Sequence, residues 1–109
     1  MTYRVVIPTT VLDAIDAQMA YLREQGAPPD RLDGWFMRLF DLIESLDRLP
    51  KRFPIAEAVS TATGEEVRRM NFGEYAVFFR VLDSRRIVEL LAFRHGRQRP
   101  WTEAEQAPK

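Results

Sequence analysis

The spacing of apolar residues predicts one strand and two helices in the first half of the chain. A short apolar run over residues 3–8 ends at a proline, which cannot donate to a strand ladder. Apolar side chains then recur at helical spacing over residues 11–25, and a broader stripe with the same period covers residues 30–49. Thr9 or Thr10 is in position to cap the first helix. The link between the helices is short and holds two prolines, so we expect an antiparallel hairpin.

Three runs rich in β-branched and aromatic residues follow in the second half. They cover residues 67–72, 75–82 and 87–93, and they are separated by Gly73 and by an Asp-Ser-Arg turn. This arrangement is typical of adjacent antiparallel strands. Both faces of the middle run are largely apolar, as expected of a central strand that is covered on one face and partly covered on the other. The pattern over residues 51–63 leaves the conformation of that segment open.

The order of these elements predicts an α+β fold. It consists of an N-terminal strand, an antiparallel helical hairpin and three antiparallel strands, with the hairpin on one face of a mostly antiparallel sheet. A length of 109 residues suits one domain, which we assign to residues 1–109. The last residues, 102–109, are polar, and we expect them to form a loose tail.

The residue types and motifs that the chain lacks exclude several kinds of site. There is no cysteine and only one histidine, which excludes disulfides, thiolate metal sites and zinc sites built on several imidazoles. No Gly-rich phosphate loop and no HExxH motif occurs, so we expect neither a metal nor a cofactor. The N-terminus lacks a signal segment and no apolar run is long enough to span a membrane. We therefore expect a cytoplasmic protein without a membrane partner.

Charge is distributed unevenly along a chain whose net charge is zero. Residues 1–50 hold five basic side chains against eight acidic ones, whereas residues 51–109 hold eleven against eight. Most of the basic residues are arginines, which suit bidentate contacts to carboxylate or phosphate groups. These charges either solvate the surface or favour an anionic partner on the face formed by the second half.

The arginine-rich strands end near the one histidine, and this region holds the candidates for chemistry. A histidine can act as a general acid or base near neutral pH, and arginines can hold a phosphate group. The candidate catalytic residues are His95, Arg97, Arg69 and Arg80. The candidate partner-binding residues are Arg68, Arg69, Tyr75, Arg94, Arg97 and Trp101. Two of them are aromatic and able to stack on a base. The alternative is that His95 orients the turn at Gly96 and that the arginines pair with Glu65, Glu66, Glu74 and Glu89.

From Tyr3 to Arg99 the chain resembles the RelE/ParE superfamily of bacterial toxins from type II toxin–antitoxin modules. The resemblance lies in the order and spacing of short segments, because none of them is specific alone. These segments are Tyr3-Arg4-Val5, the hairpin ending in Leu49-Pro50, Val67-Arg68-Arg69, residues 73–81, and residues 87–98 with their closing His-Gly-Arg.

The resemblance implies a small α+β toxin that inhibits growth, that has a role in plasmid stabilisation, and that a cognate antitoxin neutralises by wrapping around it. It also implies a toxin–antitoxin hetero-oligomer that represses its own operon. The superfamily has two branches with different targets. RelE-like toxins cleave mRNA on the ribosome with arginines and a C-terminal tyrosine or histidine, whereas ParE-like toxins inhibit DNA gyrase.

Individual positions favour the ParE-like branch. Ala76 stands where RelE-like toxins usually carry an arginine, and the catalytic tyrosine beyond Arg97 is missing, with Trp101 as the nearest aromatic residue. A net charge of zero also fits a ribosome-binding protein poorly. We therefore expect a ParE-like toxin that binds DNA gyrase. The alternatives are a metal-independent, RelE-like endoribonuclease and an inactive homologue that only binds its antitoxin.

Overall fold

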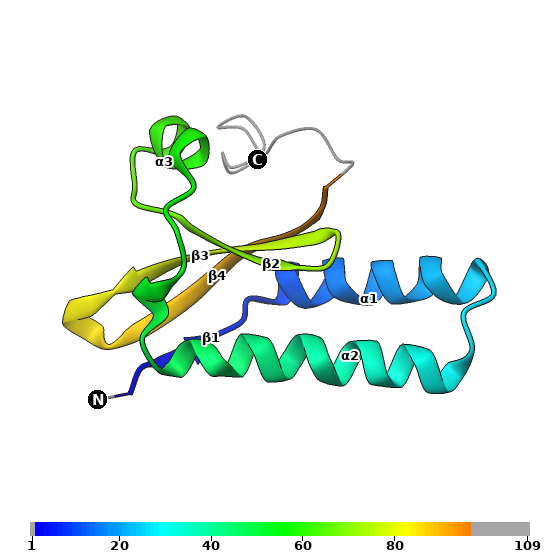
Figure 1. The fold of residues 1–109 in the computed structure, drawn as a ribbon. Helices are drawn as coiled ribbons and strands as arrows, with labels where there is room; N and C mark the ends of the chain where they lie inside the picture. The colour runs from blue at the N-terminus through cyan, green and yellow to red at the C-terminus, as the bar shows by residue number, and fades with distance from the viewer. Residues whose placement is uncertain (1, 97–109) are drawn as a thin grey trace.

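The structure, a computed structural model, describes residues 2–96 and contains a sheet covered on both faces (Figure 1). The longer elements are β1 (Arg4–Val6), α1 (Thr9–Glu24), α2 (Pro29–Glu44), α3 (Glu57–Thr63), β2 (Arg68–Phe72), β3 (Tyr75–Leu82) and β4 (Ile87–His95). Three short 3-10 turns complete the order: η1 (Ser45–Asp47), η2 (Pro50–Arg52) and η3 (Asp83–Arg85). The predicted tail at 102–109 lies outside the described residues.

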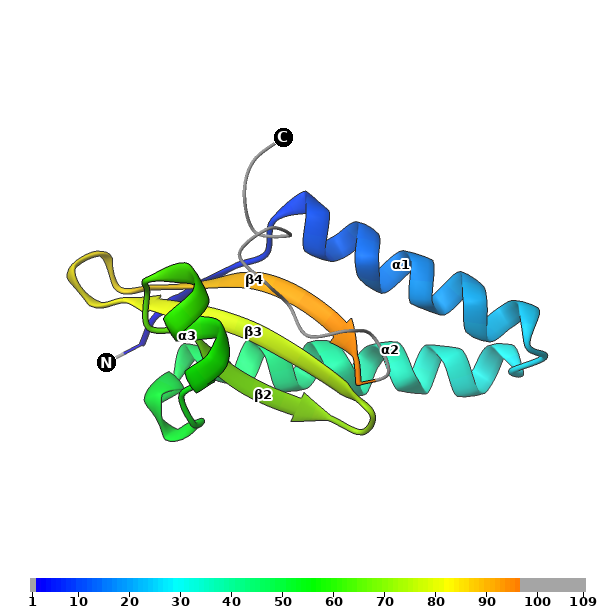
Figure 2. The same ribbon diagram turned by 90° about the horizontal axis from the view of Figure 1, so that it is seen from above.

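The sheet has the strand order β1-β4-β3-β2. β1 runs parallel to β4, whereas the other two pairs are antiparallel. Seen from above, α2 passes beneath the sheet, and α1 lies beside α2 on the side of β4 (Figure 2). The predicted α+β fold, with a helical hairpin on one face of a mostly antiparallel sheet, is therefore confirmed.

The start of α1 corrects the predicted cap. Pro8 occupies the N-cap position, without a side-chain cap, and its carbonyl accepts hydrogen bonds from the amides of Val11 (3.0 Å) and Leu12 (3.1 Å). Thr9 already belongs to the first helical turn. The threonine cap was wrong because Pro8, which is extended, delivers the chain directly into the helix.

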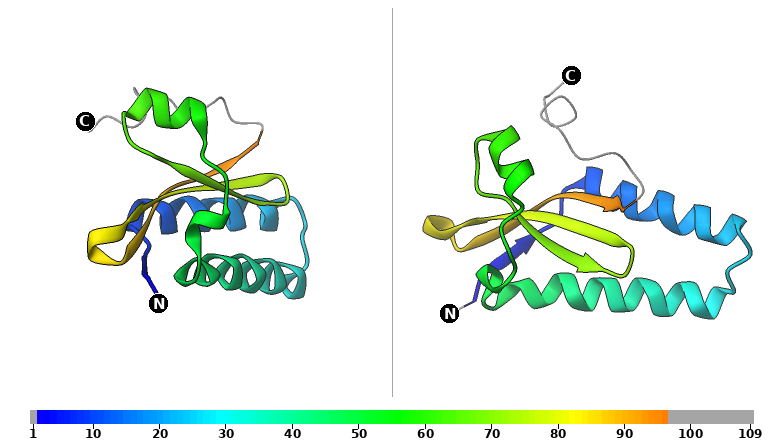
Figure 3. Two further views of the ribbon diagram at one scale, coloured as in Figure 1. Left: turned by 60° about the vertical axis from the view of Figure 1, so that its left-hand side comes forward. Right: turned by 45° about the horizontal axis from the view of Figure 1, so that its top comes forward.

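The segment left open by the sequence pattern folds back over the sheet and forms α3. The amide of Ala56 donates to the Val67 carbonyl (2.7 Å) and the amide of Arg69 to the Pro54 carbonyl (3.0 Å), so residues 54–56 extend the edge of the sheet beside β2. α3 then crosses the face opposite the hairpin (Figure 3). It ends at Gly64, whose φ of 76° lies in the left-handed region that glycine adopts without strain.

Apolar side chains pack in two layers, one on each face of the sheet. The larger core lies between the hairpin and the sheet, and its most buried members include Ile15, Leu39 and Phe79. The smaller core joins Val59 of α3 to Phe78 and its neighbours on the other face. β3 lies inside the sheet, as predicted, and all residues from Tyr75 to Phe79 are buried, so this part of the strand is covered more fully than the predicted full cover of one face and partial cover of the other.

A β-bulge in β4 decides which side chains face the hairpin. Phe78 pairs with Ala92 but Phe79 pairs with Leu90, so Leu91 is an extra residue. Leu90 and Phe93 both belong to the hairpin-side core as a result. Beyond the bulge, alternation along the strand therefore places His95 on the hairpin side and Arg94 on the α3 side.

Candidate functional site

His95 closes the last strand beside a cluster of aromatic rings. It pairs with Tyr75 across the sheet, and the two rings meet edge to face with centroids 5.0 Å apart. The ring of Tyr75 stacks on Phe93 at 5.0 Å and meets the edge of Trp35 at 5.5 Å. Burial, with a smaller contribution from the Glu74 carboxylate, raises the pKa of Tyr75. Tyr75 is thus a neutral, largely buried ring that supports His95.

A turn at Glu74 holds the end of β4 in place. The amide of Gly96 donates to the Glu74 carbonyl (2.7 Å), and Nε2 of His95 lies 3.9 Å from Oε1 of Glu74. The His95 side chain keeps a fifth of its surface exposed. The main-chain bond fixes the turn at Gly96, and the His95 imidazole stays partly accessible beside the Glu74 carboxylate.

Arg80 is bound to two carboxylates on the α3 side of the sheet. Its Nε donates to Oε1 of Glu89 on β4 (2.7 Å), and its Nη1 donates to Oε1 of Glu65, just before β2. The hydrogen bond to Glu89 is the main reason why the pKa of Arg80 is raised. Arg80 therefore shows the alternative considered from the sequence, in which arginines pair with glutamates. Its charge is balanced within the fold.

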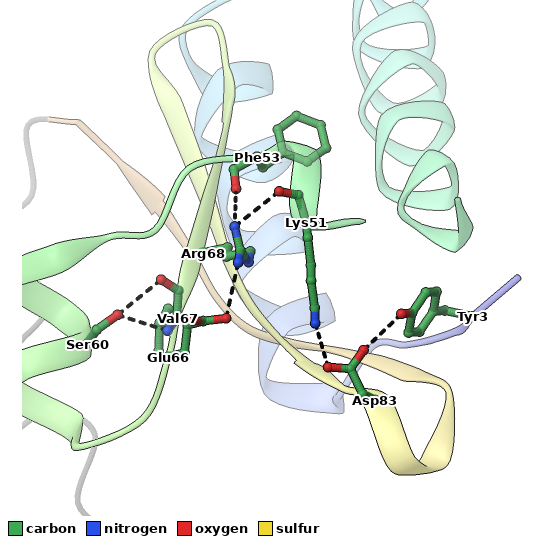
Figure 4. Close-up of polar contacts among 8 residues, drawn as sticks. All are labelled: Tyr3, Lys51, Phe53, Ser60, Glu66, Val67, Arg68 and Asp83. Carbon is green, nitrogen blue, oxygen red and sulfur yellow. Dashed lines mark hydrogen bonds and ion pairs between the residues drawn. The ribbon is translucent and has the colours of Figure 1, made fainter. Parts of the chain in front are cut away.

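Arg68 and Arg69 are neighbours whose side chains take opposite directions. Arg68 points toward the segment after α2, where Nη1 donates to the carbonyls of Phe53 (2.7 Å) and Lys51 (3.1 Å) (Figure 4). Its Nη2 donates to Oε1 of Glu66 (3.1 Å), and only 13% of the side chain is exposed. Arg68 therefore joins the start of β2 to the segment over residues 51–53.

Arg69 lies exposed on the α3 side of the sheet. Its Nε donates to Oδ1 of Asn71 (2.9 Å), and its guanidinium lies 5.6 Å from the ring centroid of Phe78. Arg94 shares this face because it pairs with Ala76, whose side chain belongs to the α3-side core. This face therefore carries the cations of Arg69 and Arg94 beside the partly buried Leu91 and Ala92, and it can contact an anionic partner.

The structure therefore distributes the predicted site residues over two faces. Arg69, Arg80 and Arg94 lie on the α3 side, whereas His95 and Tyr75 lie on the hairpin side. Arg97 and Trp101 fall outside the described residues. Within residues 2–96, no group of His, Asp or Glu side chains could hold a metal ion, and no helix has the length and apolar character needed to cross a membrane.

Sequence reasoning missed a polar contact between three distant segments, at the end of the molecule where η3 lies. Asp83 accepts hydrogen bonds from the Tyr3 hydroxyl (2.9 Å) and from Nζ of Lys51 (2.6 Å) (Figure 4). The hydrogen bond from Lys51, and to a smaller extent the one from Tyr3, lowers the pKa of Asp83. The bond between Lys51 and Asp83 also raises the pKa of Lys51. The Arg86 guanidinium lies 4.4 Å from the ring centroid of Tyr3. No local pattern signals this contact, because Tyr3 and Asp83 are 80 residues apart.

Solved structures with a similar fold come from RelE toxins. The archaeal RelE–RelB complex from Pyrococcus horikoshii OT3 matches with a TM-score of 0.58 and 22% identity, covering 90% of this chain and 99% of that one. The RelBE2 toxin–antitoxin complex from Mycobacterium tuberculosis matches at 0.59 and 20%, covering 87% and 99%. A doubly substituted RelE of Escherichia coli in the free state matches at 0.53 and 10%, covering 89% and 86%.

Comparison with curated protein sequences gives no match. A family model, described as the ParE toxin of the type II toxin–antitoxin system parDE, matches residues 5–100. This match spans both helices of the hairpin and the whole sheet apart from Arg4, while the solved structures share the same fold. The chain belongs to the ParE toxin family of type II toxin–antitoxin systems.

Proposed function

We propose that the protein is a ParE-like toxin that inhibits growth by binding DNA gyrase in the cytoplasm, and that a cognate antitoxin neutralises it. The family match favours this branch over a ribosome-dependent nuclease. The proposal makes the toxin a binding protein, whose action rests on a surface that a target enzyme recognises.

The distribution of the candidate catalytic residues carries the proposal. Metal-independent RNA cleavage needs an acid–base group and cations that converge on one phosphate. Arg69 and Arg80 lie on the α3 side of the sheet, whereas His95 packs against Tyr75 on the other side. Arg80 is further committed to two carboxylates. An arrangement of this kind supports contact with a protein better than in-line attack on a phosphodiester.

A cognate antitoxin is the second partner in the proposal. Two of the structurally similar toxins were solved in complexes with their antitoxins, which supports such a partner here. Arg68 and Tyr75 are turned into the fold, so the α3-side surface with Arg69 and Arg94 is the better candidate for an acidic antitoxin segment. Neutralisation then requires that the antitoxin and gyrase exclude one another.

A supercoiling assay with purified DNA gyrase tests the proposal. Increasing amounts of the toxin should inhibit supercoiling, and addition of the antitoxin should restore it. Gyrase that keeps full activity at saturating toxin would refute this function.

A RelE-like endoribonuclease is the second candidate, because the three solved structures named above are those of RelE toxins. In this case Arg69, Arg80, His95 and Arg97 would act on mRNA in the ribosome. His95→Ala should then abolish ribosome-dependent cleavage while the fold is retained, and an unchanged cleavage pattern would exclude that role. An inactive homologue that only binds antitoxin would leave growth unaffected when expressed alone.

A further inference from the structure

One end of the molecule gathers three segments that are far apart in the sequence: residues 3–4, 44–52 and 83–86. We call it the basic pole. The amide of Tyr3 donates to the Asp47 carbonyl (2.8 Å), and the amide of Arg4 donates to the Arg86 carbonyl (2.8 Å). Figure 1 shows the N-terminus, the end of α2 and the turn between β3 and β4 at this end. The contacts of Asp83 with Tyr3 and Lys51 hold the segments together (Figure 4).

The basic pole contains both non-glycine residues of the described chain that have a positive φ. Leu49 has a φ of 47° and Arg86 a φ of 54°. The left-handed conformation brings Cβ close to the backbone, so glycine or asparagine is the usual residue at such positions. Strained backbone of this kind is retained where the surrounding structure enforces it, and it concentrates at functional sites.

The surrounding structure holds Leu49 rigidly. The Arg52 side chain donates to the carbonyls of Leu49 (3.1 Å) and Arg48 and to the Ser45 hydroxyl (3.0 Å), while Pro50 is fully buried. Leu49 itself is 76% exposed, the highest value among the exposed large apolar residues within positions 2–96. It belongs to neither apolar core. An asparagine would suit this backbone better, so the leucine does not serve the stability of the fold.

The charge around Leu49 is basic. Six cationic residues of the pole stand against three acidic ones: Arg4, Arg48, Lys51, Arg52, Arg85 and Arg86 against Glu44, Asp47 and Asp83. Asp83 is already bound to Lys51. The exposed side chains of Arg48 and Arg85 have no ion-pair or hydrogen-bond partner among residues 2–96. A rigid apolar residue with free cations around it complements an apolar recess with an acidic rim.

We propose that the basic pole is the surface by which the toxin docks on its target enzyme, with Leu49 entering an apolar recess that is rimmed by acidic side chains. This inference rests on the proposed function, in which the target is a folded protein. A nucleic acid would contact the cations but would offer no apolar recess for the leucine side chain. A pre-organised anchor suits a folded partner, because little ordering of either surface is then needed on binding.

Leu49→Asn is the informative variant, because asparagine relieves the backbone and shortens the anchor. Its thermal unfolding midpoint should equal or exceed that of the wild type, and its antitoxin affinity should be unchanged. Growth arrest on expression without antitoxin, and inhibition of purified gyrase, should both weaken by about 10-fold or more. Arg48→Glu should weaken both as well.

The matched controls are Met37→Asn, which alters an apolar residue of α2 that is 64% exposed, and Arg31→Glu at the far end of the same helix.

Growth arrest is measured beside gyrase inhibition so that the two proposals can fail separately. If the wild-type toxin does not inhibit gyrase, the proposed function is wrong, while loss of growth arrest by Leu49→Asn still supports a docking pole for another target. Full growth arrest by a folded Leu49→Asn variant overturns the inference. The inference is also overturned if Arg48→Glu loses activity while Leu49→Asn keeps it. The contact would then depend on charge and not on the leucine side chain.

Discussion

At the scale of single residues, Arg68 and Arg69 show how one residue type acquires two roles. Met70 packs in the hairpin-side core, so alternation along β2 turns Arg68 to the same side and Arg69 to the other. The alternation is readable in the sequence, but the carbonyls that receive Arg68 belong to residues 51–53, whose conformation the sequence left open. For this reason the sequence predicts partner binding for both arginines, and only the structure shows the hydrogen bonds by which Arg68 joins β2 to residues 51–53.

Replacing Arg68 should therefore destabilise the fold far more than replacing its neighbour. Arg68→Ala removes the donors of the Phe53 and Lys51 carbonyls and should lower the free energy of unfolding by about 2 kcal/mol. Arg69→Ala, at an exposed position, should change it by less than about 0.5 kcal/mol. Urea denaturation of both variants measures the difference, and equal effects would contradict the assigned role of Arg68.

At the scale of elements, the hairpin and the strands were predictable, whereas the bulge and α3 were not. Long stretches of helical or strand periodicity define the former. In β4 the residues from Leu90 to Phe93 are all apolar, so the pattern does not reveal that Leu91 is an extra residue. Without the bulge, His95 would lie on the α3 side with Arg69 and Arg80. A single inserted residue thus determines whether the candidate catalytic residues share a face.

α3 was not predicted, because a helix of seven residues is too short to show a helical period in its apolar side chains. Its position depends on Ser60, whose hydroxyl donates to the Val67 carbonyl (3.1 Å) and accepts from the Val67 amide (2.9 Å). The Val67 carbonyl has a second donor in the Ala56 amide, whereas the Val67 amide has Ser60 as its one hydrogen-bond partner within residues 2–96. Ser60 thus fixes α3 against the start of β2.

Ser60→Ala should leave the buried Val67 amide unpaired and lower the free energy of unfolding by about 1–2 kcal/mol. Amide hydrogen exchange at Val67 should accelerate in the same variant. Thr61→Ala, one residue further along α3 at an exposed position, is the matched control and should change neither quantity appreciably. Unchanged exchange at Val67 would show that Ser60 does not hold α3.

At the scale of the whole molecule, the contact of Asp83 with Lys51 and Tyr3 gives stability a dependence on pH. The pKa of Asp83 is lowered in the fold, so its contribution is present above the pKa of the unfolded chain. It is lost as pH falls through the lowered value in the fold. The pKa of Lys51 is raised, so its contribution is present at neutral pH and is lost only in strongly alkaline solution.

The free-energy difference between the wild type and Asp83→Asn should consequently be largest near neutral pH and should shrink below about pH 4. Chemical denaturation at a series of pH values measures this difference. Asp33→Asn, at an exposed carboxylate on α2, is the control and should not reproduce the loss. A difference that stays constant down to pH 2 would contradict the contribution of the contact to stability.

The order of elements in the whole molecule, and the family, followed from the sequence, whereas the grouping of the functional residues did not. Grouping depends on contacts such as that of Tyr3 with Asp83, which no local pattern encodes. The exposed leucine at position 49 appeared in the sequence as the end of an apolar helical stripe. Only the structure shows it outside α2, with a strained backbone, on a basic surface.

The central claim, that this toxin acts by binding DNA gyrase, is tested most directly by the affinity of the purified toxin for the purified enzyme. Titration calorimetry with the wild type should give saturable binding, and prior addition of the antitoxin should abolish it. The Leu49→Asn variant should bind gyrase about 10-fold or more weakly while its affinity for the antitoxin stays the same. Absence of any interaction between gyrase and folded, antitoxin-binding toxin would contradict the claim.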